Sequence, residues 1–153
     1  VRFALRGGAP IAVAPLICYE VTEPGYVAAA AARGADLLLT LSNDAWFPDA
    51  AGPRLHLVVA AFRSIETRLP QLRATNSGLS ALISPTGELR ATTEFAARTA
   101  FRVQVPRPPH PRTLVVAWGD WLGPLSLGLV AALLAWARFR RRATPAAGRR
   151  TPV

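Results

Sequence analysis

Residues 11–41 have the sequence IAVAPLICYEVTEPGYVAAAAARGADLLLTL, in which two apolar runs flank an alanine-rich segment. The first run, residues 11–17, is short, nearly continuous and rich in branched side chains, which is typical of a strand buried on both faces. A helix is predicted over residues 26–33, because a proline lies near its start and a glycine follows its end. Residues 36–41 form a second buried strand. Strand, helix and strand in succession indicate a parallel βαβ unit and an α/β fold.

Cys18 directly follows the first strand, at the edge where parallel α/β folds present reactive groups. Backbone N–H groups that begin with Tyr19 would then face an oxyanion formed on an attacked carbonyl. A lone cysteine after an apolar strand is also commonly a small buried side chain. The position by itself therefore leaves open both a nucleophile and a buried thiol. Because the chain has one cysteine, an internal disulfide is excluded.

A polar loop over residues 42–49 follows the second strand, and a helix is predicted from Gly52-Pro53 to about Leu69, where Pro70 stops it. Within this helix Arg63 and Glu66 are expected to form an i, i+3 ion pair rather than to act in catalysis. The apolar residues recur at helical spacing and give the helix one apolar face. That face comprises Leu55, Val58, Val59, Phe62, Ile65 and Leu69, while His56, Arg63 and Thr67 fall elsewhere on the helix.

Further strands are predicted at residues 71–74 and 79–83, and another after the turn at residues 85–87. Residues 100–105 alternate between apolar and polar and are expected to close the sheet, so the catalytic part of the chain is placed at residues 1–105. Residues 106–113 form a stiff linker, because repeated prolines favour extended backbone.

Residues 114–137 are almost wholly apolar, with Asp120 as their only charge, and are long enough to span a membrane as a helix. Trp118, Trp121 and Trp136 lie towards the ends of this stretch, as interfacial anchors do. A buried core helix is the alternative, although core helices seldom adjoin several arginines. The basic residues of the tail, 138–153, place that tail in the cytoplasm and the preceding domain outside it.

The net charge of +9 comes mainly from this tail, which holds six of the 18 arginines, and there is no lysine. Residues 1–137 carry 12 arginines against 9 acids, a net charge of +3. We therefore expect no nucleic-acid binding, and expect the tail to meet anionic lipid headgroups. One cysteine and two histidines make a metal site within this chain unfavourable, and we expect no metal and no cofactor.

Four motifs, in this order and spacing, resemble the apolipoprotein N-acyltransferase family of the carbon–nitrogen hydrolase (nitrilase) superfamily. They are Leu16–Glu20, Leu39–Phe47, Ala51–Pro53 with His56, and Leu72–Gly78. Arg112-Thr113 and Trp118–Trp121 are similar to the C-terminal end of that family. The resemblance implies the C-terminal part of an αββα sandwich, followed by one transmembrane helix, in the bacterial cytoplasmic (inner) membrane with the catalytic domain on the extracytoplasmic side.

Members of the family use a Glu, Lys and Cys triad in which the Glu and Lys precede the Cys, and only the cysteine matches here, as Cys18. Neither Glu23 nor Glu66 stands where it would replace the general base. Since the chain begins with valine, we expect the N-terminal part of a longer protein to be missing and this chain to be inactive alone. A further departure is Pro48, where the family usually has glycine, in the loop that would line an acyl pocket.

The resemblance implies a ping-pong reaction. Cys18 would take an acyl group from a phospholipid donor as a thioester and pass it to the diacylglyceryl-modified N-terminal cysteine of a lipoprotein. Tyr19 and Glu20 match positions beside the nucleophile and are expected to shape the site. The remaining site-lining candidates are Asn43, Asp44, Trp46, Phe47 and Asn76. Turn formation by the two asparagines, Asp44 and Gly78, and core packing of the two aromatic residues, are the ordinary alternatives.

Two other functions remain open from the sequence. One is a nitrilase-type amidase that uses water as acceptor, against which the apolar C-terminal segment argues. The other is a degenerate, non-catalytic membrane-anchored module, suggested by the unmatched Glu and Lys.

Overall fold

The computed structural model describes residues 1–4, 8–107, 109 and 113–143. Four positions of the predicted linker, 108 and 110–112, and the last ten residues of the predicted tail lie outside the described residues. The chain divides into two units, residues 1–119 and residues 120–153, and each is described by itself.

The first unit is built on a six-stranded sheet whose strands lie side by side in sequence order. Strands β2, β3 and β4 are parallel, and β1, β5 and β6 are antiparallel to their neighbours. The strands are β1 (Arg2–Phe3), β2 (Ile11–Ile17), β3 (Leu37–Asn43), β4 (Gln71–Asn76), β5 (Ala81–Ile83) and β6 (Leu89–Thr92). The predicted βαβ unit and the strands expected after it are confirmed.

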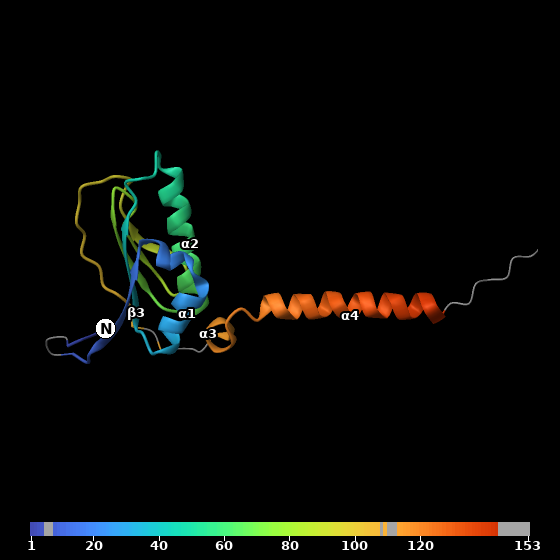
Figure 1. The fold of residues 1–153 in the computed structure, drawn as a ribbon. Coiled ribbons are helices and arrows are strands. Elements are labelled where there is room, and N and C mark those ends of the chain that lie inside the picture. Colours follow the sequence, from blue (N-terminus) through green and yellow to red (C-terminus); the bar gives the residue numbers. More distant parts are fainter. Residues whose placement is uncertain (5–7, 108, 110–112, 144–153) are drawn as a thin grey trace, which may run out of the picture. The chain divides into compact units, whose positions relative to one another are not determined.

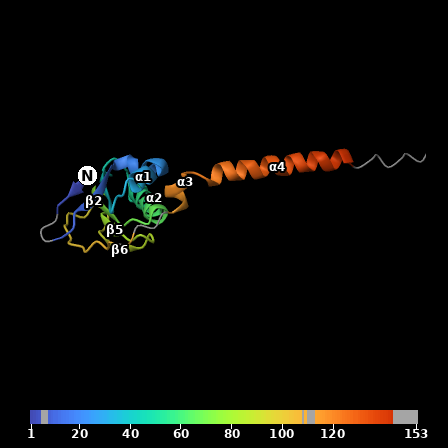
Figure 2. The same ribbon diagram turned by 90° about the horizontal axis from the view of Figure 1, so that it is seen from below.

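Two helices, α1 (Pro24–Ala32) and α2 (Ala51–Thr67), cover one face of this sheet, as Figures 1 and 2 show from two directions. Because side chains alternate along a strand, every second residue of β2, β3 and β4 faces these helices. Leu16 and Leu38 are two such residues, and both are completely buried. They pack with Val27 of α1 and with Ala60 of α2, which forms the apolar core between the sheet and the helices.

The face that α2 turns to the sheet differs from the apolar face found by spacing. The residues that it buries are Pro53, His56, Leu57, Ala60, Arg63, Ser64 and Thr67. Leu55, Val58, Phe62 and Ile65 of the apolar face are exposed instead. The polar inner residues are tolerated because partners on neighbouring elements meet them, as when Ser64 Oγ donates to Gln71 Oε1 at 3.3 Å.

The prediction of a strand at residues 100–105 is wrong. Residues 97–107 form an extended segment outside the sheet, which in both ribbon views runs on the side opposite α1 and α2 (Figures 1 and 2). At its end, Arg107 Nη2 donates to Pro10 O at 2.7 Å and to Asp36 Oδ2 at 3.2 Å. Val103 and Val105 are half-buried and Gln104 between them is exposed, so the alternation reflects a segment that lies on a surface.

The single helix predicted over residues 114–137 is divided. The short helix α3 (Leu114–Trp118) belongs to the first unit, where it packs against α1 and α2. Thr113 caps it by accepting from Val116 N and donates to Glu66 O at 2.6 Å. Gly119 ends α3 with a φ of 67°, a left-handed value that suits glycine.

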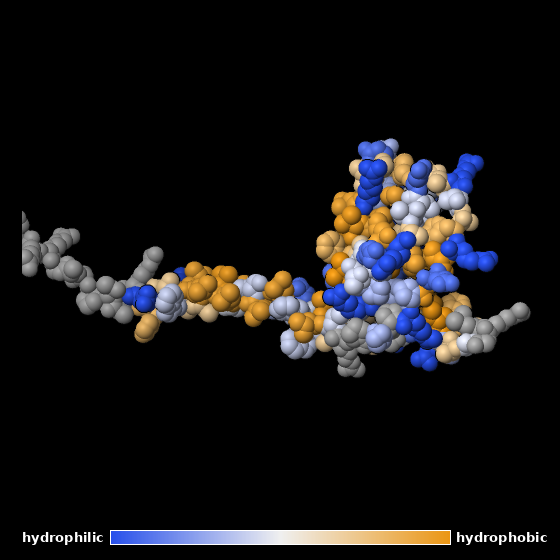
Figure 3. Space-filling model, turned by 180° about the vertical axis from the view of Figure 1, so that it is seen from behind, coloured by the Kyte–Doolittle hydropathy of each residue, from blue (hydrophilic) through white to orange (hydrophobic). Residues whose placement is uncertain are grey.

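The second unit contains α4 (Leu122–Ala143). Residues Leu122–Arg140 are long and apolar enough to cross a membrane, by length and composition. Figure 3 shows the helix with a mostly apolar surface and basic residues at its C-terminal end. Arg140 lies over the ring of Trp136 at 4.6 Å, a cation–π contact beside the predicted membrane interface.

Candidate active site at the carboxyl ends of β2 and β3

Cys18 lies where β2 ends and a 3₁₀ helix, η1 (Cys18–Thr22), begins, as predicted. Its φ is 48°, the left-handed region that a non-glycine residue enters at a cost and that recurs at functional sites. The turn is held by Glu20, whose Oε2 accepts from Ile17 N at 2.7 Å. Thr22 Oγ1 also donates to Tyr19 O at 2.8 Å. These two bonds fix the sharp turn that presents the sulfur.

Ser42 brings the end of β3 to this sulfur. The parallel register pairs Ile17 with Leu41, so the next residue of β3 lies beside Cys18. Ser42 Oγ is 3.5 Å from Cys18 Sγ and donates to Asp44 Oδ1 at 2.6 Å. Asp44 is 1% exposed, so its carboxylate is a buried charge next to the site.

Arg73 of β4 supplies the opposite charge. Its Nη2 donates to Asp44 Oδ2 at 2.9 Å, and both side chains are inaccessible to solvent. His56 of α2 completes the cluster, because its Nδ1 is 3.2 Å from Asp44 Oδ1 and 3.0 Å from Arg73 Nη2. A ring nitrogen that carries a proton donates to Asp44, and one that lacks it accepts from Arg73. We refer to Ser42, Asp44, His56 and Arg73 as the polar cluster.

Burial governs the charges of the polar cluster. Burial, and then the nearby Arg73 charge, lower the pKa of His56 below its usual 6.5, with Asp44 opposing them. Burial also lowers the pKa of Arg73, and Asp44 opposes that change. A guanidinium stays protonated in proteins, so the cluster holds a neutral imidazole and an ion pair. Arg73 Nε and Nη1 and His56 Nε2 are buried with no partner among the described residues.

Gly78 makes room for the carboxylate of Asp44. A Cβ at this glycine would overlap the Asp44 side chain, whereas the glycine's own φ is not left-handed. Close packing therefore requires a glycine at position 78, whereas the backbone conformation does not. The prediction of a turn former did not include this packing role.

An apolar hollow of about 220 Å³ adjoins the sulfur. It is bounded by η1, the loop after β3 and the start of α2. Trp46 and Phe47 stack with ring centroids 3.9 Å apart, and Gly52 leaves space for the Phe47 ring. Trp46 is 68% exposed, so core packing does not account for it. The lining residues are Cys18, Tyr19, Thr22, Trp46, Phe47, Gly52, Leu55, His56 and Val59.

The other predicted site residues lie in different surroundings. Tyr19 lines the apolar hollow but is 70% exposed. Asn76 Nδ2 donates to Asn43 Oδ1 at 3.1 Å, and this oxygen also accepts from Ala45 N at 3.2 Å. Both asparagines are exposed and tie the ends of β3 and β4 together. They are the last residues of β3 and β4, whereas Asp44 joins the buried polar cluster. Arg63 and Glu66 form the expected ion pair, at 2.7 Å.

Sequence reasoning included Ser42, His56 and Arg73 in the motifs that carry the family resemblance but did not name them as site residues. The signal was present in the strand period, because Thr40 and Ser42 share a face of β3 and the register pairs Thr40 with Arg73. Which residue of α2 meets that face depends on how the helix lies on the sheet. Among the described residues no group of three histidine, cysteine or acidic side chains could hold a metal.

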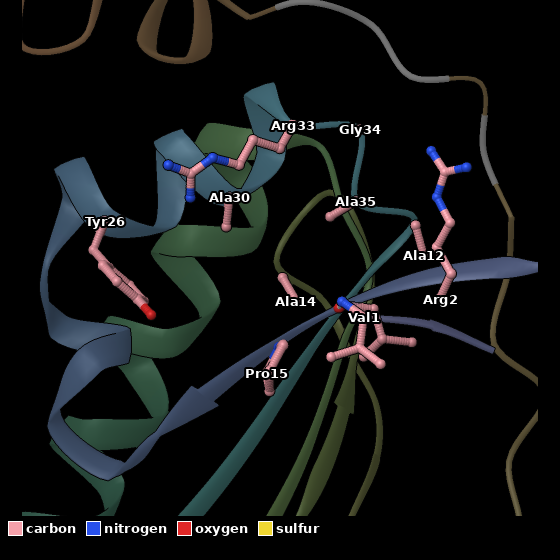
Figure 4. Close-up of a pocket in the computed structure, with 11 residues that line it drawn as sticks. Val1, Arg2, Ala12, Ala14, Pro15, Tyr26, Ala30, Arg33, Gly34 and Ala35 are labelled. Atoms are coloured by element: carbon pink, nitrogen blue, oxygen red, sulfur yellow. The ribbon is translucent and has the colours of Figure 1, made fainter.

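A second hollow, of about 260 Å³, lies between β2 and α1 (Figure 4). Its labelled lining includes Arg2, Tyr26 and Arg33, and none of the described residues that line it is an acid, a histidine or a cysteine. We assign no chemistry to it.

The carbon-nitrogen hydrolase family model matches residues 2–107, and the chain belongs to this family. An amidase from Nesterenkonia sp. superimposes with a TM-score of 0.50 at 24% identity, covering 62% of this chain and 37% of that one. That likeness concerns the fold, and the nitrilase-superfamily α/β fold is confirmed.

Within the family, apolipoprotein N-acyltransferases are among the relatives of this chain. The one from Azotobacter vinelandii is 44% identical over 135 residues, which cover 88% of this chain and 25% of that protein. Apolipoprotein N-acyltransferase 2 from Treponema pallidum is 37% identical, covering 75% and 21%. The chain thus spans about a quarter of the length of the curated relatives that it matches.

Proposed function

We propose that this chain is the C-terminal part of an apolipoprotein N-acyltransferase and that Cys18 carries the acyl group. The observation that carries the proposal is the sulfur of Cys18, held on a strained turn beside an apolar hollow. Relatives named for this activity match most of the chain. An acyl chain is apolar, so a hollow of this kind favours a lipid donor over a polar amide.

The proposed reaction has two transfers. In the first, the Cys18 thiolate attacks the ester carbonyl of a phospholipid, a C–S bond forms, the ester C–O bond breaks, and the lysophospholipid leaves with a proton. In the second, the α-amino group of a diacylglyceryl-modified cysteine attacks the thioester, a C–N bond forms and the C–S bond breaks. The proton released by the amine passes through the base to the sulfur, which restores the thiol.

The base and the lysine of the family's triad have no counterpart among the residues of this chain, which contains no lysine. We therefore propose that the triad is completed by residues preceding Cys18 in a longer protein. The 153-residue chain alone is expected to give no turnover.

The position of α4 after the catalytic unit supports a membrane location. A site tethered to a bilayer meets lipid substrates at high effective concentration. From the relatives' named activity we propose the bacterial inner membrane, and from the distribution of arginines we propose that the catalytic domain lies on the extracytoplasmic side and the tail in the cytoplasm.

The test uses the complete protein in mixed micelles with a phospholipid carrying labelled acyl chains and a synthetic diacylglyceryl-cysteinyl peptide. Mass spectrometry is expected to find an acyl thioester on Cys18 when the peptide is omitted, and an N-acylated peptide when it is present. Cys18→Ser is expected to lower transfer by at least about a thousandfold, because an alcohol is a far weaker nucleophile at neutral pH. Tyr26→Phe, on α1 away from this sulfur, is the control.

Three results would overturn the proposal. Transfer at an unchanged rate in Cys18→Ser would remove the nucleophile. Release of free fatty acid without peptide acylation would indicate the amidase-type alternative with water as acceptor. Neither thioester nor product in the complete protein would indicate the non-catalytic module.

A further inference from the structure

We propose that Ser42 is a second catalytic residue, which holds the sulfur of Cys18 through its hydroxyl, and that Asp44 and Arg73 are positioning residues acting through Ser42. The part that concerns acyl transfer rests on the function proposed above. The contacts that carry the inference stand on the geometry of the polar cluster.

The hydroxyl of Ser42 has one proton and two neighbours that could receive it. Its oxygen is 2.6 Å from Asp44 Oδ1 and 3.5 Å from Cys18 Sγ, so in the resting thiol form the proton points to the carboxylate. The oxygen keeps lone pairs free, and the thiol S–H donates to one of them. This arrangement fixes the direction of the S–H bond before any base removes its proton.

When the thiol loses its proton, the sulfur changes from a hydrogen-bond donor to an acceptor. A thiolate accepts hydrogen bonds, and rotation about the Ser42 Cβ–Oγ bond swings the hydroxyl proton from Asp44 to the sulfur. Asp44 keeps its bond from Arg73 Nη2, at 2.9 Å, so the carboxylate is not left unpaired. When the C–S bond to the acyl carbon forms, the sulfur loses its charge and the hydroxyl returns to Asp44. The hydroxyl proton stays on Ser42 throughout.

Arg73 makes a carboxylate tolerable at this place. An unpaired Asp44 so close to the sulfur would oppose formation of a thiolate, because like charges repel strongly where solvent is excluded. Asp44 and Arg73 are both inaccessible to solvent and neutralise each other. The pair can therefore hold Ser42 in place without repelling the charge on the sulfur.

The test measures the sulfur directly, by the rate at which iodoacetamide alkylates the only cysteine of this chain, in detergent at one fixed pH. Ser42→Ala is expected to slow alkylation about tenfold, since hydrogen bonds to charged groups are among the stronger ones. Thr40→Val is the matched control. Thr40 is a buried hydroxyl on the same face of β3, accepts from Gln71 Nε2 at 2.6 Å, and lies two residues away. Its rate is expected within about twofold of the parent chain.

A second set of variants tests whether Asp44 and Arg73 act through Ser42. Asp44→Asn combined with Arg73→Met removes both charges together and is expected to slow alkylation in the parent chain but not further in Ser42→Ala. Should that double variant not fold, Gly78→Ala displaces the carboxylate without changing charge and is expected to show the same dependence on Ser42. Circular dichroism establishes that each variant is folded at the assay temperature.

Equal alkylation rates in Ser42→Ala and Thr40→Val would overturn the role of Ser42. Equal slowing by the Asp44 and Arg73 substitutions with and without Ser42 would overturn the positioning role. Neither assay contains an acyl donor or acceptor, so both results stand whether or not the protein proves to be an acyltransferase.

Discussion

The two faces of α2 do not divide into an apolar inner side and a polar outer side, as the faces of a surface helix usually do. The inner face carries His56, Arg63, Ser64 and Thr67, all buried, whereas the outer face exposes apolar side chains, with Phe62 at 53%. A helix on a sheet ordinarily turns its apolar stripe to the core. Here Leu57 and Ala60 share the inner face with polar residues that have partners on the sheet, such as Ser64, whose Oγ donates to Gln71 Oε1 of β4 at 3.3 Å.

The difference shows which interactions let each face of α2 contribute to the free energy of folding. Buried polar groups stabilise a fold only while their partners are present, so the inner face depends on particular contacts with β3 and β4. The outer apolar face contributes little to folding while it stays in water, and exposed apolar surface favours self-association. We expect the inner face to be intolerant of substitution and the outer face to govern solubility.

The largest expected effect is at the inner contact of the polar cluster. Arg73→Met should lower the free energy of unfolding by about 3–5 kcal/mol, because it leaves the buried Asp44 carboxylate without an opposite charge. Urea unfolding followed by circular dichroism measures it. The control is Arg90→Met, which breaks the exposed Arg90–Glu88 pair of 2.9 Å and should cost less than about 1 kcal/mol. Equal losses in the two variants would contradict the dependence on burial.

A smaller effect should appear as the pH falls. Because the pKa of folded His56 lies below 6.5, the unfolded chain binds a proton there that the folded chain does not. His56 therefore contributes fully to stability above pH 6.5, and this contribution is lost progressively as the pH falls below it, towards the folded pKa. Glu66, whose pKa burial raises above 4.5, acts in the opposite direction, since its folded form retains a proton that the unfolded form releases.

The difference between the parent chain and His56→Gln isolates the histidine, because Glu66 is common to both. Unfolding in urea across this pH range should show a stability loss in the parent that the variant lacks. If the free energy of unfolding changed with pH in the same way in both proteins, burial in the inner face would not lower the pKa of His56.

The smallest effect is expected on the outer face. Val58→Ser and Phe62→Ser should each change the free energy of unfolding by no more than about 0.5 kcal/mol while reducing self-association, measured by light scattering. Ala60→Ser is the matched inner substitution. It places a hydroxyl at a completely buried position and should cost about 1–3 kcal/mol. A larger loss at Phe62 than at Ala60 would reverse the assignment of the two faces.

The local elements of this fold follow from sequence because they rest on period and turn chemistry. The apolar runs at residues 11–17 and 37–41 and the helix ending before Pro70 needed no tertiary information. The orientation of α2 did, because its most regular pattern belongs to the outer face. The strand prediction for residues 100–105 failed for a related reason. Alternation indicates that one side of a segment is buried and the other is exposed, but not that a neighbouring strand pairs with it.

The site divides in the same way. Cys18 was identifiable from its strand end and its motif, and Asp44 from the polar loop after β3. His56 and Arg73 are 12 and 29 residues from Asp44, and only the packing of α2 and β4 against β3 brings them together. The motif singled out His56, but helical spacing alone did not show that its partners would be Asp44 and Arg73. Gly78 likewise shows its role only when the Asp44 side chain is in place.

At Cys18, the left-handed backbone conformation makes chemical reactivity and thermal stability conflicting requirements on one residue. Glycine would occupy a φ of 48° with less strain, by roughly 1 kcal/mol, and would have no sulfur. The most heat-resistant form of this turn is thus an inert one. A laboratory selection that scored survival of heating alone would drift away from the cysteine, and only a paired selection for chemistry would keep it.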